Sequence, residues 1–338
     1  MKRKPKQPWT ADDLLSLGRS YQAAAVFAAA ADLDLFDALA CGALQAKELA
    51  RKLRCDLRGL IILLDALVAL RLLTKRGGRY SLPAGAAAFL TSDGSRSILA
   101  MAQHQANCLR NWAQLARIVK TGQPANRTPS VRGTAGDAAA FIGAMHNVSA
   151  PVADQVIHAI KPLRFHHLLD IGGASGTWTI AFLRACPSAK ATLFDLPHVI
   201  PMARRRLAAA GLDRRVKLVA GDFMADALPG GADLAWVSAI LHQNSRAQNR
   251  RLFANVFQAL VPGGRIAIRD ILMDATRTRP VAGALFAVNM LVATEGGGTF
   301  TFEELRKDLK TAGFVEAAAV RRDEGMNSVV VARKPSSP

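Results

Sequence analysis

The sequence predicts an α/β protein with a doubly wound, mostly parallel sheet in its C-terminal half and a mostly helical domain before it. From Leu168 onward, short apolar runs alternate with helical patterns, which is typical of a parallel sheet with helices on both faces. Before this point the chain is rich in Ala and Leu at helical spacing. We therefore divide the chain into a helical domain (1–125), a linker with a connecting helix (126–160) and a sheet domain (161–338).

The predicted strands of the sheet domain are short and apolar. They are Leu168–Ile171, Ala191–Phe194, Val216–Ala220, Leu234–Ser238, Arg265–Arg269 and Asn327–Ala332. Residues 122–137 are rich in Gly, Pro, Ser and Thr and predict a loop, and a helical pattern resumes at Ala138–Ile160. The segment Pro262-Gly263-Gly264 predicts a turn from a helix into the fifth strand.

The N-terminal region contains a compact arrangement of two helices and a hairpin. Ala46–Leu53 and Leu57–Leu70 have helical spacing, and a Gly77-Gly78 pair between two short strand-like runs predicts a hairpin. This order is that of a winged helix. Ahead of it, Ala23–Ala31 is almost entirely apolar, so we expect a helix that is buried on all sides, in part against a second subunit.

Winged helices often bind DNA, but this one predicts a packing or dimerisation role. The second helix would read the groove, yet its interior offers only Arg58 and Asp65 to a duplex. The net charge of +18 is carried partly by the basic start of the chain, and no basic stripe with interleaved aromatic residues is present. We expect a homodimer that binds neither nucleic acid nor a membrane.

The cysteines and the start of the chain predict a cytoplasmic protein. The four cysteines, Cys41, Cys55, Cys108 and Cys186, are far apart and form no C-x-x-C pair, so we expect reduced, buried thiols. The basic start is followed by polar residues, where a signal peptide would have an apolar core. The apolar stretch Gly59–Leu70 is too short to cross a bilayer.

The segment 170–176, DIGGASG, follows the first strand and precedes a helix. Its glycines allow a tight turn and let a ligand approach the backbone closely. Dinucleotide dehydrogenases carry a related segment, so the glycines alone are weak evidence. The carboxylate of Asp170 would repel a pyrophosphate and suits a ligand with a cationic amino-acid head and a sulfonium. The sequence therefore favours S-adenosylmethionine (SAM) as the cofactor.

Further acidic residues end the next two strands, at the edge where doubly wound sheets bind ligands. Asp195 lies 19 residues beyond Gly176 and can accept hydrogen bonds from both ribose hydroxyls of an adenosine. Asp222 and Phe223 end the third strand, where adenine should lie. The predicted cofactor-binding residues are Asp170, Gly172, Gly173, Gly176, Asp195, Leu196, Asp222, Phe223 and Ser238.

The chain resembles the small-molecule O-methyltransferases whose plant members methylate caffeic acid and flavonoids and whose animal relative methylates acetylserotonin, and it is most similar to bacterial members. The resemblance covers nearly the whole chain and includes VALRLLTKRGGRYSL, DIGGASG, FDLPHV, GDF, LVPGGRIAI and MLVATEGGGTFTFEELRKDLKTAGF. It implies a Rossmann-like methyltransferase domain, an N-terminal winged-helix dimerisation domain, SAM as cofactor and O-methylation of a hydroxyl, phenolic or similar, on a small molecule. No metal is implied.

The resemblance also implies the catalytic residues. His242, just after the fourth strand, corresponds to the general base of the family, and Asp270, after the fifth strand, corresponds to a Glu that orients it. The chain departs from the family at several positions near this base. Gln243 and Asn244 replace Asp-Trp, Thr299 replaces a second Glu, and Ala174 replaces a Gly. Glu295 is close in sequence and is a candidate to compensate for the missing Glu.

Five residues correspond to positions that line the acceptor pocket in the family. They are Phe141, Met145, His146, Asn289 and Met290. The first three also fit an ordinary core stripe of a helix. Two alternative functions stay open at this point. One is a C- or N-methyltransferase, or a relative with altered chemistry, which the departures around His242 allow, and the other is a DNA-binding regulator that senses the cofactor.

Overall fold

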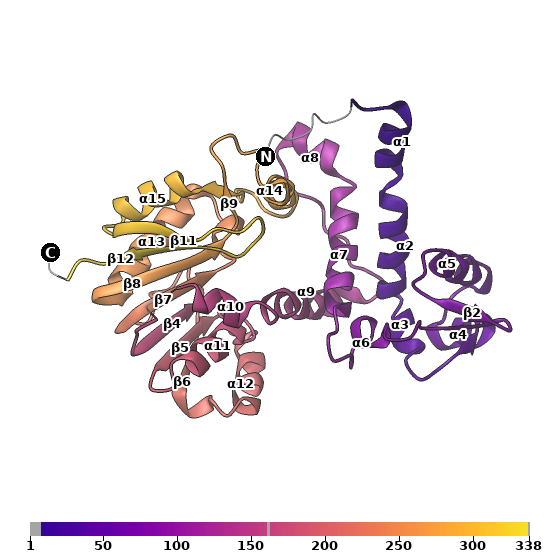
Figure 1. The fold of residues 1–338 in the computed structure, drawn as a ribbon, viewed down its shortest axis with the longest axis horizontal. Coiled ribbons are helices and arrows are strands. Elements are labelled where there is room, and N and C mark those ends of the chain that lie inside the picture. The colour runs from indigo at the N-terminus through magenta and orange to yellow at the C-terminus, as the bar shows by residue number, and fades with distance from the viewer. Residues whose placement is uncertain (1–7, 161–162, 337–338) are drawn as a thin grey trace. The chain divides into compact units, whose positions relative to one another are not determined.

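The computed structural model describes residues 8–160 and 163–336 and divides into two compact units. The first unit contains Met1–Arg110 and Thr128–Asn147, and the second contains Asn111–Arg127 and Val148–Pro338. The first is mostly helical and the second is an α/β unit, so the predicted fold class is confirmed (Figure 1).

The first unit combines helices with one small sheet. Its helices are α1 (Ala11–Arg19), α2 (Tyr21–Asp32), α3 (Leu35–Ala38), α4 (Ala46–Leu53), α5 (Leu57–Ala69), α6 (Ala87–Leu90) and most of α7 (Leu99–Trp112) and α9 (Gly133–Ser149). Its strands are β1 (Leu44–Gln45), β2 (Thr74–Arg76) and β3 (Arg79–Ser81), all antiparallel in the order β1-β3-β2. The predicted order of α4, α5 and hairpin is therefore confirmed, and β1 is an addition that the sequence did not predict.

Capping and burial explain the boundaries of these helices. Thr10 forms a capping box with Asp13 at the start of α1, and Asp56 accepts the backbone N–H of Gly59 at the start of α5. One face of α5 enters the core through Leu60, Leu64 and Leu67. By contrast, α1 buries no residue at all in this chain.

The connecting helix α9 begins earlier than the sequence predicted. The loop prediction ran to residue 137, whereas α9 starts at Gly133. Asp137 accepts hydrogen bonds from the backbone N–H of Ser130, at 2.9 Å, and from its hydroxyl, at 2.5 Å. These side-chain contacts satisfy the polar groups just ahead of the helix, so the low helix propensity of Gly and Thr is overcome locally.

The second unit contains a seven-stranded sheet, a two-stranded sheet and helices. Its helices are α8 (Leu115–Thr121), α10 (Ala153–His158), α11 (Thr177–Ala185), α12 (Ile200–Ala209), α13 (Arg246–Ala259), α14 (Val281–Ala293) and α15 (Phe302–Thr311), with 3-10 turns η1 (Asp213–Arg215) and η2 (Leu241–Gln243). Its strands are β4 (His167–Ile171), β5 (Lys190–Asp195), β6 (Val216–Ala220), β7 (Ala232–Ser238), β8 (Leu260–Asp270), β9 (Leu272–Met273), β10 (Phe300–Thr301), β11 (Val315–Arg321) and β12 (Ser328–Arg333).

The large sheet is mostly parallel, as predicted. Its strand order is β11-β12-β8-β7-β4-β5-β6, in which β4 to β8 run parallel and β12 is antiparallel to both of its neighbours. The order reverses beside β4, whose neighbours are β5 and β7. Such a switch point is where doubly wound sheets bind their ligands.

Helices cover both faces of this sheet (Figure 1). One core layer contains Val156 of α10, Phe182 of α11 and Leu207 of α12. The other contains Phe253 of α13 and Leu309 of α15. Because both faces are buried, the central strands are mostly apolar, which is why they could be recognised in the sequence.

Two local expectations are wrong. Pro262-Gly263-Gly264 is not a turn before the fifth strand but lies within β8, which begins at Leu260 directly after α13. All four cysteines are free, but Cys41 is exposed and the other three are half-buried. Within residues 8–160 and 163–336, the structure has no helix with the length and apolar character needed to cross a membrane.

Candidate active site

The glycine-rich loop joins β4 to α11, and its backbone requires residues without large side chains. Gly172 and Gly176 have φ angles of +64° and +77°. A Cβ atom on Gly172 would lie 2.6 Å from Cδ1 of Ile240, and one on Gly173 would lie 2.6 Å from Cγ of Leu193. The loop therefore packs closely against Ile240 and Leu193 and has no room for a side chain at Gly172 or Gly173.

Ala174 occupies a left-handed position in the same loop, with φ of +45°. A left-handed conformation costs an L-residue other than glycine roughly 1 kcal/mol or more. Its backbone N–H donates to Oδ2 of Asp195 at 2.7 Å, which holds the conformation in place. Ala174, in place of the glycine that the resemblance implies, therefore strains the loop.

Asp170 lies beneath the loop rather than on its open side. Its side chain is 1% exposed, and Oδ2 accepts the hydroxyl of Thr179 in α11 at 2.5 Å. Burial raises the pKa of Asp170 to about 7. The sequence predicted a fixed negative charge at this position, whereas the burial seen in the structure favours the neutral carboxyl group.

Asp195 connects the end of β5 to the glycine loop. Its two oxygens accept the backbone N–H groups of Ala174 and Leu196, each at 2.7 Å. Burial raises its pKa, against the opposing effect of these two hydrogen bonds. Each carboxylate oxygen has further lone pairs that can accept a ligand hydroxyl. Leu196 is partly exposed beside it.

The end of β6 brings a carboxylate and an aromatic ring to the same edge. Asp222 is half-buried, and its Oδ1 accepts the backbone N–H of Met224 at 2.8 Å. Phe223 is half-buried, and its ring lies 3.9 Å from the position of a Cβ atom on Gly172. The structure therefore brings Phe223 against the glycine loop.

His242 and Asp270 are in direct contact across the edge of the sheet. Nδ1 of His242 lies 2.9 Å from Oδ1 and 3.1 Å from Oδ2 of Asp270, and the backbone N–H of His242 donates to Oδ2 at 3.3 Å. The ring of Phe286 in α14 packs edge-on against the imidazole, and the centres of the two rings are 4.8 Å apart. A carboxylate can only accept here, so Nδ1 carries the proton and Nε2 keeps its basic lone pair.

Of the residues near His242 that differ from the expected family pattern, Asn244 has a clear structural role. Asn244 is buried and donates to Oδ1 of Asn249, which in turn donates to the backbone oxygen of Leu241. This network fixes the η2 turn that carries His242. Thr299 is buried and its carbonyl accepts from Arg277.

The neighbourhood of Thr299 does not supply a second carboxylate to the base. The backbone N–H of Gly298 donates to the carbonyl of His242 at 2.8 Å, so this segment holds the main chain of the base and not its ring. Glu295 is solvent-exposed. In the described part of the chain, the carboxylate that contacts the imidazole is that of Asp270.

Ser238 ends β7, and its hydroxyl accepts from Arg269 at 3.2 Å. Arg269 was not among the residues predicted for the site. The signal was present, because a basic residue in the middle of the apolar run IAIRDIL is unusual for a buried strand.

The five predicted acceptor residues fall into two groups. Phe141, Met145 and His146 lie on α9 in the first unit, where the ring of Phe141 packs against His104 at 5.2 Å. Asn289 and Met290 lie on α14 in the second unit, the helix whose Phe286 contacts His242. Oδ1 of Asn289 accepts the indole N–H of Trp112 at 2.8 Å, and Met290 is buried.

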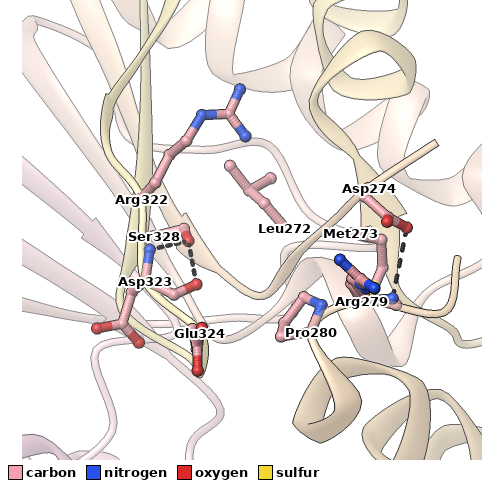
Figure 2. Close-up of a pocket in the computed structure, with 9 residues that line it drawn as sticks. All are labelled: Leu272, Met273, Asp274, Arg279, Pro280, Arg322, Asp323, Glu324 and Ser328. Atoms are coloured by element: carbon pink, nitrogen blue, oxygen red, sulfur yellow. Dashed lines mark hydrogen bonds between the residues drawn. The ribbon is translucent and has the colours of Figure 1, made fainter. Parts of the chain in front are cut away.

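A pocket of about 320 Å³ lies near the end of β8 but is separate from the predicted site residues. Figure 2 shows Arg322, Asp323, Glu324 and Ser328 on one side and Asp274, Arg279 and Pro280 on the other. None of the predicted site residues lines it. Within residues 8–160 and 163–336, no group of three or more His, Cys, Asp or Glu residues could hold a metal ion.

Comparisons with known proteins match both halves of the chain. A family model described as an O-methyltransferase domain matches residues 120–315, and one described as an O-methyltransferase dimerisation domain matches residues 15–92. The 3-hydroxy-5-methyl-1-naphthoate 3-O-methyltransferase of Streptomyces sahachiroi is 34% identical over 90% of each chain. The N,N-dimethyltransferase OxyT of Streptomyces rimosus is 30% identical over 96% of this chain and 97% of its own.

A solved structure shares the fold over the whole chain. Human N-acetylserotonin methyltransferase in complex with SAM superposes with a TM-score of 0.82 at 26% identity and covers 98% of this chain and 100% of its own. Another neighbour, PigF, was solved with S-adenosylhomocysteine (SAH) and has a TM-score of 0.84.

The strain at Ala174 predicts that Ala174→Gly stabilises the protein. Glycine adopts the left-handed conformation without steric cost, so the free energy of unfolding should rise by about 1 kcal/mol. The matched control is Ala254→Gly at an exposed position inside α13, which should lower it by about 1 kcal/mol. Urea denaturation measures both, and equal changes in the two variants would contradict the strain argument.

The raised pKa of Asp170 predicts a pH-dependent stability difference. Between its ordinary pKa of 3.8 and about 7, the folded chain keeps a proton that the unfolded chain loses, so this group lowers stability as pH rises through that range. Asp170→Asn cannot ionise but still accepts the Thr179 hydroxyl. The ligand-free variant should therefore exceed the wild type by up to roughly 4 kcal/mol at pH 8 and by little at pH 4. The same difference at both pH values in urea unfolding would show that ionisation of Asp170 is not its source.

Proposed function

The chain belongs to the O-methyltransferase family that carries an O-methyltransferase dimerisation domain, and from this membership we propose that it methylates a hydroxyl, phenolic or similar, on a small molecule with His242 as general base. It is a SAM-dependent O-methyltransferase. Family membership therefore establishes the type of reaction. The acceptor class and the residues that act on the acceptor are what we propose.

The residues at the sheet edge fit SAM in chemistry. The carboxylate of Asp195 has lone pairs for ribose hydroxyls, the Phe223 ring offers an apolar face for adenine, and the glycine loop offers bare backbone. When bound, SAM supplies an activated methyl group on its sulfonium. The chain must then place the acceptor oxygen in line with that methyl group and remove the hydroxyl proton.

The observation that carries the proposal is the contact between Nδ1 of His242 and Asp270. This contact fixes the tautomer and leaves Nε2 free to take the acceptor proton. As the new O–CH₃ bond forms, the methyl–sulfur bond breaks and SAH leaves with the electron pair. The imidazolium that results is stabilised by the Asp270 carboxylate and then releases its proton to solvent.

The alternative functions are less well supported. The change to Asn244, which kept a different chemistry open, is explained by its buried contact with Asn249. OxyT shows that an N-methyltransferase exists among the relatives, but the O-methyltransferases among them favour oxygen as the acceptor atom. The matches do not favour a DNA-binding regulator. A cytoplasmic location stays a prediction.

General-base catalysis by His242 predicts a large loss of turnover without loss of the cofactor. His242→Ala should lower kcat on the true acceptor by about 10²- to 10⁴-fold while SAH still raises the Tm. Asp270→Asn should cost less, because an amide oxygen can still accept from the ring. Asp195→Ala is the contrast, since it should remove most of the SAH-induced rise in Tm. If His242→Ala keeps more than about a third of the wild-type turnover, His242 is not the base.

The dimerisation domain suggests a homodimer, and we propose that α1 contributes to its interface. Leu14, Leu15 and Leu17 are more than half exposed on a helix that buries nothing within its own chain. Light scattering at micromolar concentration should give twice the chain mass. Leu14→Arg with Leu17→Arg should shift the protein toward monomer, whereas Val320→Arg on the exposed side of β11 should not. A wild-type chain that stays monomeric would contradict the proposal.

A further inference from the structure

Arg269 is a buried cation inside the sheet, next to the proposed active site. It precedes Asp270 at the end of β8, and its side chain is 2% exposed. Because neighbouring residues of a strand point to opposite faces, Asp270 contacts His242 while Arg269 lies on the face that carries α11. The mechanism proposed above makes no use of this guanidinium.

Three segments of the second unit converge on the guanidinium. Its Nε and Nη2 atoms donate to Oδ1 of Asn327, at 3.0 and 2.7 Å, just ahead of β12. Nη1 donates to Oγ of Ser238, the last residue of β7, at 3.2 Å. The guanidinium carbon lies 4.7 Å from the centre of the Trp178 ring, in the first turn of α11. Arg269 therefore joins the strand end that carries Ser238 to the helix that follows the glycine loop.

The charge of Arg269 is unusual for this location. The contacts just named are with an amide oxygen, a hydroxyl and an aromatic ring, all of them uncharged. Burying a cation without a carboxylate in contact is costly. Burial lowers the pKa of Arg269 to about 10, against the opposing attraction of the nearby carboxylates of Asp270 and Asp323, so the group still carries its charge at neutral pH. Its hydrogen bonds are all made to uncharged groups, so the guanidinium can still attract the anionic group of a bound ligand.

SAM brings one anion and two cations to the site. Its amino-acid end carries an α-carboxylate and an ammonium group, and the sulfonium is the second cation. Two residues near the loop carry charges opposite to those of the amino-acid end of SAM: Asp170 lies beneath the loop, and Arg269 contacts Ser238. Asp170 can accommodate the ammonium group of SAM, and Arg269 can accommodate its carboxylate.

We propose that Arg269 is a positioning residue for the cofactor, which fixes the Ser238 hydroxyl and supplies the positive charge that holds the α-carboxylate of SAM at the end of β7. The inference rests on SAM binding and on the proposed place of Ser238 in that site. It does not depend on whether His242 is the base.

Two ligands that differ only in the amino-acid end test this role. SAH carries the α-carboxylate, and 5′-methylthioadenosine has the same adenosine and thioether but ends in a methyl group. In calorimetric titrations, Arg269→Met should weaken SAH by about 10- to 100-fold, the range for losing a hydrogen bond to a charged group. Its affinity for 5′-methylthioadenosine should stay within about twofold of the wild type. Arg265→Met on the same strand is the charge-matched control and should change neither affinity.

Two further variants separate positioning from packing. Arg269→Lys keeps the charge and should retain more SAH affinity than Arg269→Met. If Arg269 acts through Ser238, the loss caused by Arg269→Met should be smaller in a Ser238→Ala background than in the wild type. Should Arg269→Met fail to fold, Ser238→Ala alone must still weaken SAH more than 5′-methylthioadenosine.

Equal losses for both ligands would reduce Arg269 to a packing residue, and unchanged affinity for SAH would also overturn the proposal. Turnover of His242→Ala is measured separately. If His242→Ala keeps its turnover, the role of Arg269 can still be judged from the binding data. If Arg269→Met binds SAH normally, the role of His242 can still be judged from turnover.

Discussion

The parallel pairing of β7 with its neighbours β4 and β8 is the constraint on which the site depends. Ser238 pairs with Arg269 in this register, so the chain that leaves β7 passes directly over the end of β8. Four residues later it carries His242, which therefore meets Asp270 without any long side chain having to bridge the gap. On the other side, β4 ends in the glycine loop. A slip of one residue between β7 and β8 would move every side chain to the opposite face and separate the pair.

Much of this arrangement could be predicted from the sequence, because the buried parallel strands are continuous apolar runs and their ends are marked by Asp195, Asp222 and Asp270. The edge strand β11 could not. Its residues VEAAAVR alternate weakly, most of them are exposed or half-buried, and their pairing with β12 is interrupted by register shifts. Alanine also favours helix over strand. Arg269 was not predicted because a central strand is expected to be apolar. Its position in the apolar run IAIRDIL was a visible exception, but the sequence does not show which buried groups satisfy its charge.

The position of the glycine loop, in contrast, was predicted from the sequence, but the backbone strain at Ala174 and the raised pKa of Asp170 were not. The sequence shows that Ala174 replaces a glycine, yet only the φ angle shows that the methyl group sits on a left-handed residue. Similarly, the sequence places Asp170 before the loop, but its raised pKa comes from burial, which the hydrogen bond from Thr179 partly offsets. Both features lower the stability of the ligand-free protein. Strain and buried charge of this kind are tolerated where a ligand later compensates for them.

The acidic and basic groups around the loop differ in how they are held. Asp170 has one close hydroxyl partner and a pKa near neutrality, so its charge can follow the arrival of a cation. Arg269 has three hydrogen bonds and an aromatic ring, and its pKa of about 10 leaves it charged throughout the physiological range. The charge of Arg269 is therefore constant near neutral pH, whereas the charge of Asp170 can change. Arg269 therefore keeps its charge and its contact with Ser238 whichever charge the cofactor carries, whereas the protonation of the buried Asp170 can differ between the cationic SAM and the neutral thioether SAH.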